Sequence, residues 1–125
     1  MADDHLELAE RFFAAIETGD LAAVGDLYAP SAEIWHNHDG LVQDRESNLK
    51  TLAWMVANLP HRRYDVIRRS ATADGFVQQH VLSATNRAGQ NVELPACIIC
   101  TIADGRIVRL DEYFDSRHAE RFADH

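Results

Sequence analysis

The sequence predicts an α+β domain in which helices in the N-terminal half pack on one face of a mainly antiparallel sheet. Apolar residues recur with helical spacing as far as residue 59, and from residue 64 onward they alternate with a period of two. Short turn sequences separate the later segments, as in hairpins. A chain of 125 residues has the size of one domain with one hydrophobic core, so we expect a single domain over residues 1–125.

Three helices are expected in the first half. The apolar face of the first helix is formed by Leu6, Ala9, Phe13 and Ile16. Asp4 followed three residues later by Glu7 resembles a capping pair, and Gly19 ends this helix. Asp20 caps a shorter second helix that ends at Ala29-Pro30. A third helix begins after Asp44 and closes at Pro60.

The strands come next in chain order. A brief strand, about 32–37, leads into the Asp39-Gly40 turn, and four longer strands are expected at 64–72, 76–85, 92–102 and 106–114. The sequences "ADG" at 73–75, "NRAGQN" at 86–91 and "ADG" at 103–105 connect them as antiparallel hairpins. A short helix from about Arg117 follows the last strand.

The segment "VELPACIICTI" is apolar on both faces of its predicted strand. Three helices cover only one face of a sheet, and a strand that is apolar on both faces needs two covers. We therefore expect a homodimer that packs through the other sheet face. Cys97 and Cys100 lie three apart in this strand and point to opposite faces, so they form neither a disulfide nor a metal site, and we expect both to be buried apolar residues.

The charge of the chain limits its partners. Twelve basic and twenty acidic residues give a formal net charge of -8, which repels phosphate backbones and argues against nucleic acid. No apolar stretch approaches the ~18 residues that a membrane span needs. The acidic N-terminus "MADDHLELAE" lacks the layout of a signal peptide, so we expect a cytoplasmic protein.

Two segments carry a family resemblance. "TGDLAAVGDLYAPSAEI" followed by "DGRIVRLDEYFD" resembles the nuclear-transport-factor-two-like superfamily over about residues 6–115. That group includes SnoaL-like polyketide cyclases, ketosteroid isomerases and limonene epoxide hydrolases. The resemblance implies a cone-shaped α+β barrel, with three helices against a curved sheet around a deep apolar pocket. It also implies acid–base chemistry without a metal or organic cofactor.

The polar residues of these enzymes are only partly matched. Where ketosteroid isomerases have a tyrosine, an aspartate base and a protonated acid, this chain has Phe12, His36 and Ile98. Against limonene epoxide hydrolases it keeps Asn37, replaces a tyrosine by Trp35, and has His80 and Leu82 in place of an Arg-x-Asp pair. Glu112 is the nearest equivalent of the late-strand carboxylate of the SnoaL-like cyclases.

The residue pattern also favours Glu112 as a catalytic group. Alternation puts Arg106, Val108, Leu110, Glu112 and Phe114 on one face of the last strand. An inward Glu112 would have its pKa raised by desolvation, although an ion pair with an arginine is the structural alternative. His80, on the same side of its strand as Gln78, is then the expected acid–base partner of Glu112.

The run "WHNHD" allows two registers. His36 and His38 share one side of the strand and Trp35 and Asn37 the other, and a bulge exchanges the two. We favour Trp35 as pocket wall and Asn37 as the group that orients a water or carbonyl, with His36 as the competing base. His38 and Asp39 are then solvated turn residues. A metal site on His36 and His38, with His80 or Glu112 as third ligand, is a minor alternative.

The sequence thus predicts a cofactor-independent acid–base enzyme for a small apolar molecule, of isomerase, cyclase, dehydratase or epoxide hydrolase type. Glu112, His80, Asn37 and His36 are its candidate catalytic residues. Trp35, Phe12, Leu110 and Gln78 are its candidate substrate-binding residues. The alternative is a ligand-binding or dimerisation domain of the same fold without catalytic activity.

Overall fold

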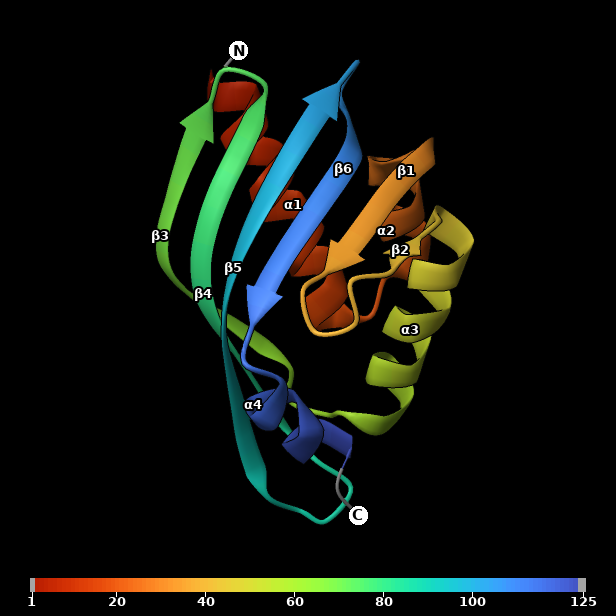
Figure 1. The fold of residues 1–125 in the computed structure, drawn as a ribbon, viewed down its shortest axis with the longest axis vertical. Coiled ribbons are helices and arrows are strands. Elements are labelled where there is room, and N and C mark those ends of the chain that lie inside the picture. The colour runs from red at the N-terminus through yellow and green to blue at the C-terminus, as the bar shows by residue number, and fades with distance from the viewer. Residues whose placement is uncertain (1, 124–125) are drawn as a thin grey trace.

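The computed structural model describes residues 2–123 as helices packed on one six-stranded sheet (Figure 1). The helices are α1 (Ala2–Thr18), α2 (Leu21–Leu27), α3 (Arg45–Asn58), α4 (Ser116–Glu120) and the 3-10 turn η1 (Arg121–Ala123). The strands are β1 (Tyr28–His36), β2 (Val42–Gln43), β3 (Arg63–Thr72), β4 (Gly75–Thr85), β5 (Asn91–Ala103) and β6 (Arg106–Phe114). The α+β class with three N-terminal helices is confirmed.

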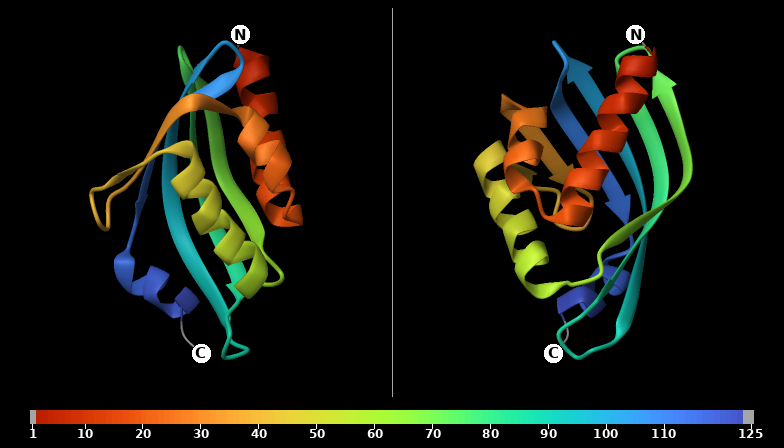
Figure 2. Two further views of the ribbon diagram at one scale, coloured as in Figure 1. Left: turned by 90° about the vertical axis from the view of Figure 1, so that its right-hand side faces the viewer. Right: turned by 180° about the vertical axis from the view of Figure 1, so that it is seen from behind.

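The sheet has the order β2-β1-β6-β5-β4-β3. Strands β3 to β6 form the predicted antiparallel meander, whereas β1 pairs with β6 in parallel. The sheet is therefore mixed and open, with β2 and β3 as its edges. Figure 2 shows α1, α2 and α3 on the same face of the strongly curved sheet.

The helix caps lie largely where the sequence places them. The side chain of Asp20 accepts a hydrogen bond from the backbone N–H of Ala23, and Asp44 accepts one from that of Ser47. The first helix differs, since it already includes the residues before Asp4. The second also differs, because Tyr28 belongs to β1 and continues into the strand.

A bulge corrects the predicted faces of β6. The pairing of β5 with β6 shifts between Thr101 and Ile102, so Ile107 is buried instead of Arg106 and Val108. Downstream of the shift, Leu110 and Glu112 face the helices as predicted. One extra residue in a strand exchanges the inward and outward side chains on one side of the bulge. The alternation of apolar residues in the sequence does not show where that extra residue lies.

Arg62 ties the ends of two helices together. Its guanidinium donates to the carbonyl oxygens of Ile16 (3.2 Å) and Glu17 (3.1 Å) in α1, and to that of Leu59 (2.9 Å) just after α3. These carbonyls end their helices without intrahelical partners, and a cation there satisfies them. The contact holds the C-terminal ends of α1 and α3 together over the lower part of the sheet.

Candidate active site

A cavity of about 440 Å³ lies between α1, α3, the inner face of the sheet and the C-terminal helices. Most of its lining is apolar, including Phe12, Ile98 and Leu110. The hydrogen-bonding side chains that line it are Tyr28, His36, His38, Asp39, Gln43, Asn48, Thr51, Trp54, Tyr64 and Glu112. Such a cavity suits a mostly apolar ligand that is oriented by a few polar groups.

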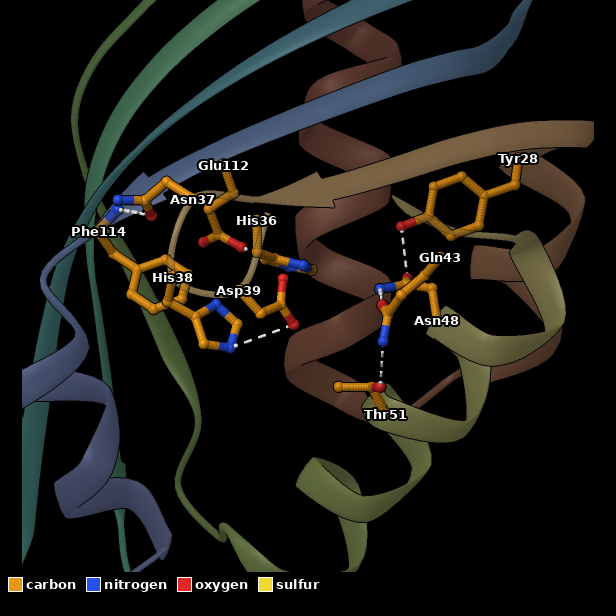
Figure 3. A network of polar contacts seen from close by, with 10 residues as sticks. All are labelled: Tyr28, His36, Asn37, His38, Asp39, Gln43, Asn48, Thr51, Glu112 and Phe114. Carbon is orange, nitrogen blue, oxygen red and sulfur yellow. Dashed lines mark hydrogen bonds and ion pairs between the residues drawn. The ribbon is translucent and has the colours of Figure 1, made fainter. Parts of the chain in front are cut away.

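His36 and Glu112 form a hydrogen-bonded pair inside this cavity. The parallel pairing of β1 with β6 places the two residues directly opposite each other, and His36 Nε2 lies 3.1 Å from Glu112 Oε1. Both side chains are only 16% exposed. Figure 3 shows the two side chains pointing toward each other. Because Nε2–H donates to the carboxylate, Nδ1 of a neutral His36 keeps a free lone pair. This arrangement of a base oriented by a carboxylate is suited to proton transfer.

The partner of Glu112 is therefore His36, and the predicted pair with His80 is not formed. His80 is 1% exposed and does not line the cavity. Its Nδ1 lies 2.8 Å from Nε2 of Gln78, whose Oε1 accepts from Arg69 Nε at 2.6 Å. Arginine only donates, so the Gln78 amide donates to His80 Nδ1 and the proton of His80 is on Nε2. The two residues thus form a structural network behind the cavity wall, and the substrate-binding role expected of Gln78 does not fit this position.

The register of "WHNHD" is the opposite of the one we favoured. Trp35 lies on the outer face of the sheet, where its ring packs against Tyr113 with centroids 5.2 Å apart. Asn37 bridges strands, since its Oδ1 accepts from the N–H of Phe114 at 2.9 Å and its own N–H donates to the carbonyl of Glu112 at 3.0 Å (Figure 3). Neither residue lines the cavity. Asn37 instead holds the end of β6, and with it Glu112, against β1.

His38 and Asp39 are more than turn residues, because both line the cavity. His38 Nε2 lies 3.6 Å from Asp39 Oδ2, and both side chains are well exposed. The ring of His38 packs against Phe114 with a centroid distance of 5.0 Å. The two residues therefore form the solvent-facing rim of the site. Within residues 2–123, no three His, Cys, Asp or Glu side chains are grouped closely enough to hold a metal ion.

A polar chain occupies another part of the wall, where α3 faces β1. The Tyr28 hydroxyl donates to Asn48 Oδ1 at 2.7 Å, Asn48 Nδ2 donates to Gln43 Oε1 at 3.0 Å, and Gln43 Nε2 donates to Thr51 Oγ1 at 3.2 Å (Figure 3). Burial raises the pKa of Tyr28 well above its usual value, so its hydroxyl stays protonated. Nothing in the local sequence pattern of these four residues predicts that they converge, because they come from three separate segments of the chain.

We expect the pKa values of His36 and His80 to be shifted in opposite directions. Burial lowers the pKa of His36, but the hydrogen bond and charge of Glu112, with the charge of Asp39, raise it above 6.5 overall. Burial lowers the pKa of His80 below 6.5. Imidazole NMR signals should show His36 titrating above 6.5, the ordinary pKa of histidine, and His80 titrating below it. Similar midpoints for the two would contradict this assignment.

The same shifts set opposite contributions to folding stability. The His36 pair contributes fully below pH 6.5, and its contribution is lost as the pH rises through the raised pKa. His80 must be neutral in the folded protein, so its site loses stability as the pH falls from 6.5 toward the lowered pKa. The combined contribution of His36 and His80 to folding stability should therefore be greatest near pH 6.5, the ordinary pKa of histidine.

Cys100 is buried as expected, whereas Cys97 is partly exposed, and both thiols are free. Within residues 2–123, no helix combines the length and apolar character that crossing a membrane requires.

Comparisons with known proteins agree with this architecture. A family model described as "SnoaL-like domain" matches residues 9–110. An uncharacterised protein of Mycobacterium tuberculosis is 30% identical over 123 residues, which cover 91% of this chain and 92% of that protein. A solved M. tuberculosis structure described as an LEH-like epoxide hydrolase is 15% identical, with a TM-score of 0.82 and coverage of 97% of this chain and 90% of that one. A putative SnoaL-like polyketide cyclase from Shewanella denitrificans is 10% identical, with a TM-score of 0.81 and 94% coverage of both chains.

Proposed function

Because the chain belongs to the SnoaL-like domain family, we propose that it is a cofactor-independent acid–base enzyme acting on a small, mostly apolar molecule. One observation carries the proposal: the 3.1 Å contact between His36 and Glu112 in the wall of a largely apolar cavity. Acid–base pairs in such surroundings exchange protons near neutral pH. The reaction is an isomerisation, cyclisation or dehydration of a carbonyl compound, or the opening of an epoxide.

In this mechanism His36 is the group that moves the proton. Neutral His36 accepts a proton from the substrate, or from a water molecule, on Nδ1. Glu112 holds the ring through Nε2–H and stabilises the imidazolium that forms, as a carboxylate does for the histidine of a catalytic triad. The protonated His36 then returns the proton to another atom of the substrate. Asn37 acts as a positioning residue through its bond to the end of β6.

Proton transfer can be measured without knowing the natural substrate. Uncharged ketones and enones are incubated with the protein in D₂O, and loss of the α-proton signals is followed by NMR, while epoxides are assayed for diol formation. We expect exchange or conversion with at least one compound, and its loss in the variant His36→Gln. Ligand binding without any proton transfer across the whole series would contradict an enzyme.

That outcome would support a ligand-binding domain of the same fold, which one observation favours. Phe12 and Ile98 line the cavity with apolar side chains, so two positions near the pair bring no polar group to the reaction. In a binding domain, the variant His36→Gln should keep the affinity of the wild-type protein for ligands.

We further propose that a second copy of the chain covers the outer face of the sheet. Ile99 (42% exposed) and Tyr113 (48% exposed) lie on this face beside Trp35, and α1, α2 and α3 all pack on the other face. Sedimentation equilibrium should give twice the monomer mass of 14.1 kDa. Ile99→Asp should yield the monomer, and the control Leu41→Asp, at an exposed apolar residue before β2, should not. A monomeric wild-type protein would contradict the proposal.

A further inference from the structure

Tyr64, near the start of β3, brings a hydroxyl group to the cavity wall. Its backbone N–H donates to Glu17 Oε2 at 2.8 Å. Its ring packs edge to face against Phe13 and against His80, with centroid distances of 4.9 Å in each case. The side chain is therefore held from both sides, and its hydroxyl is placed by the fold instead of by a hydrogen bond.

No residue between 2 and 123 accepts a hydrogen bond from this hydroxyl. The oxygen is also not among the fully enclosed polar atoms that lack a partner, so it is open to the cavity. Tyr64 is partly buried, and a hydroxyl that opens into an apolar cavity without a protein acceptor is completed by a ligand or by water.

The other buried donors of the cavity are already used. The hydroxyl of Tyr28 donates to Asn48, and the amide of Asn48 donates to Gln43. His36 Nε2–H donates to Glu112. The partly buried Tyr64 thus brings to the wall a hydroxyl group whose hydrogen no residue between 2 and 123 accepts, whereas the hydroxyls of Tyr28 and Thr51 are engaged.

We propose that the Tyr64 hydroxyl donates a hydrogen bond to an uncharged oxygen of the ligand, so that the site selects carbonyl compounds over hydrocarbons of the same shape. Its catalytic meaning rests on the proposed function: while His36 removes a proton, the bond to Tyr64 stabilises the negative charge that develops on the carbonyl oxygen. The recognition itself needs no catalysis.

The charges around the cavity define the ligand further. The carboxylates of Glu112 and Asp39 both line it, so an anionic ligand is repelled. Burial, followed by the charges of Glu112 and Glu17, raises the pKa of Tyr64 far above neutrality. The hydroxyl therefore stays protonated near neutral pH, and a neutral carbonyl oxygen is the matching acceptor.

Cyclohexenone labelled with ¹³C at the carbonyl carbon is a direct probe. Binding to wild-type protein should lower the carbonyl stretching frequency, because a hydrogen bond weakens the C=O bond. The variant Tyr64→Phe should abolish this change and weaken cyclohexenone binding about tenfold, while methylenecyclohexane binds both proteins equally. Phenylalanine keeps the ring contacts with Phe13 and His80, so the fold is preserved.

Tyr28→Phe is the matched control, because that hydroxyl is already engaged by Asn48. It should leave the carbonyl frequency of the bound probe unchanged. A wild-type protein that shows no shift at any soluble cyclohexenone concentration, or a shift that persists in Tyr64→Phe, would overturn the inference. A normal shift without α-proton exchange would instead count against the proposed function and leave the role of Tyr64 intact.

Discussion

Replacing Glu112 by glutamine should slow proton transfer by up to about 10⁴-fold, the loss that follows when the orienting carboxylate of a catalytic triad becomes an amide. The glutamine carbonyl can still accept from His36 Nε2–H at the same place, so the ring keeps its orientation. The amide carries no charge, and the imidazolium that forms during the reaction loses its stabilisation. The measurement is the rate of α-proton exchange or epoxide conversion for the compound that the wild-type protein turns over.

The same variant has a second readout that does not depend on activity. Without Glu112, burial is the main influence left on His36, and its pKa should fall below 6.5. Asp111→Asn is the matched control, because Asp111 is the next carboxylate on β6 and pairs with Arg109 instead. It should change neither the rate nor the pKa of His36. Unchanged turnover in Glu112→Gln would remove Glu112 from the mechanism.

The elements of the fold follow from local patterns, which is why the sequence predicts most of them. Asp20 and Asp44 cap their helices through contacts three residues away, and the hairpin turns join neighbouring strands. The parallel pairing of β1 with β6 is different, because it joins segments about seventy-five residues apart. The register of this pairing decides that His36 faces inward and Trp35 outward. The residues of "WHNHD" alone do not predict that register.

Local patterns also predict some residues of the candidate site, but not which of them contact each other. The alternation of the last strand makes Glu112 a candidate, and the resemblance to ketosteroid isomerases makes His36 one. Their pairing with each other, and the position of His80 behind the wall, depend on contacts between distant strands. Tyr64 looks like any aromatic residue of a strand in the sequence, and only the absence of an acceptor for its hydroxyl among residues 2–123 distinguishes it.

Gly75→Ala should be the most destabilising glycine-to-alanine change among the described residues, although Gly105 lies in an identical tripeptide. "ADG" occurs at 73–75 and at 103–105. In the second, Asp104 and Gly105 have φ of 53° and 74°, so this glycine serves the turn. Gly75 has no positive φ, but a Cβ placed there would lie 1.8 Å from the backbone oxygen of Cys100.

That contact cannot be relieved by a side-chain rotation, because Gly75 is paired with Thr101 and the atom it meets is backbone. The start of β4 must separate from β5, and we expect a loss of about 3 kcal/mol or more in the free energy of unfolding. Gly25→Ala in α2 is the control: its Cβ would lie 3.5 Å from Leu49 Cδ1, and alanine should stabilise the helix by up to about 1 kcal/mol. Urea unfolding of both variants measures the two effects. Equal stability of Gly75→Ala and the wild-type protein would mean that β4 and β5 are not in this register, and since β5 also pairs with β6, the position of Glu112 would then have to be reconsidered.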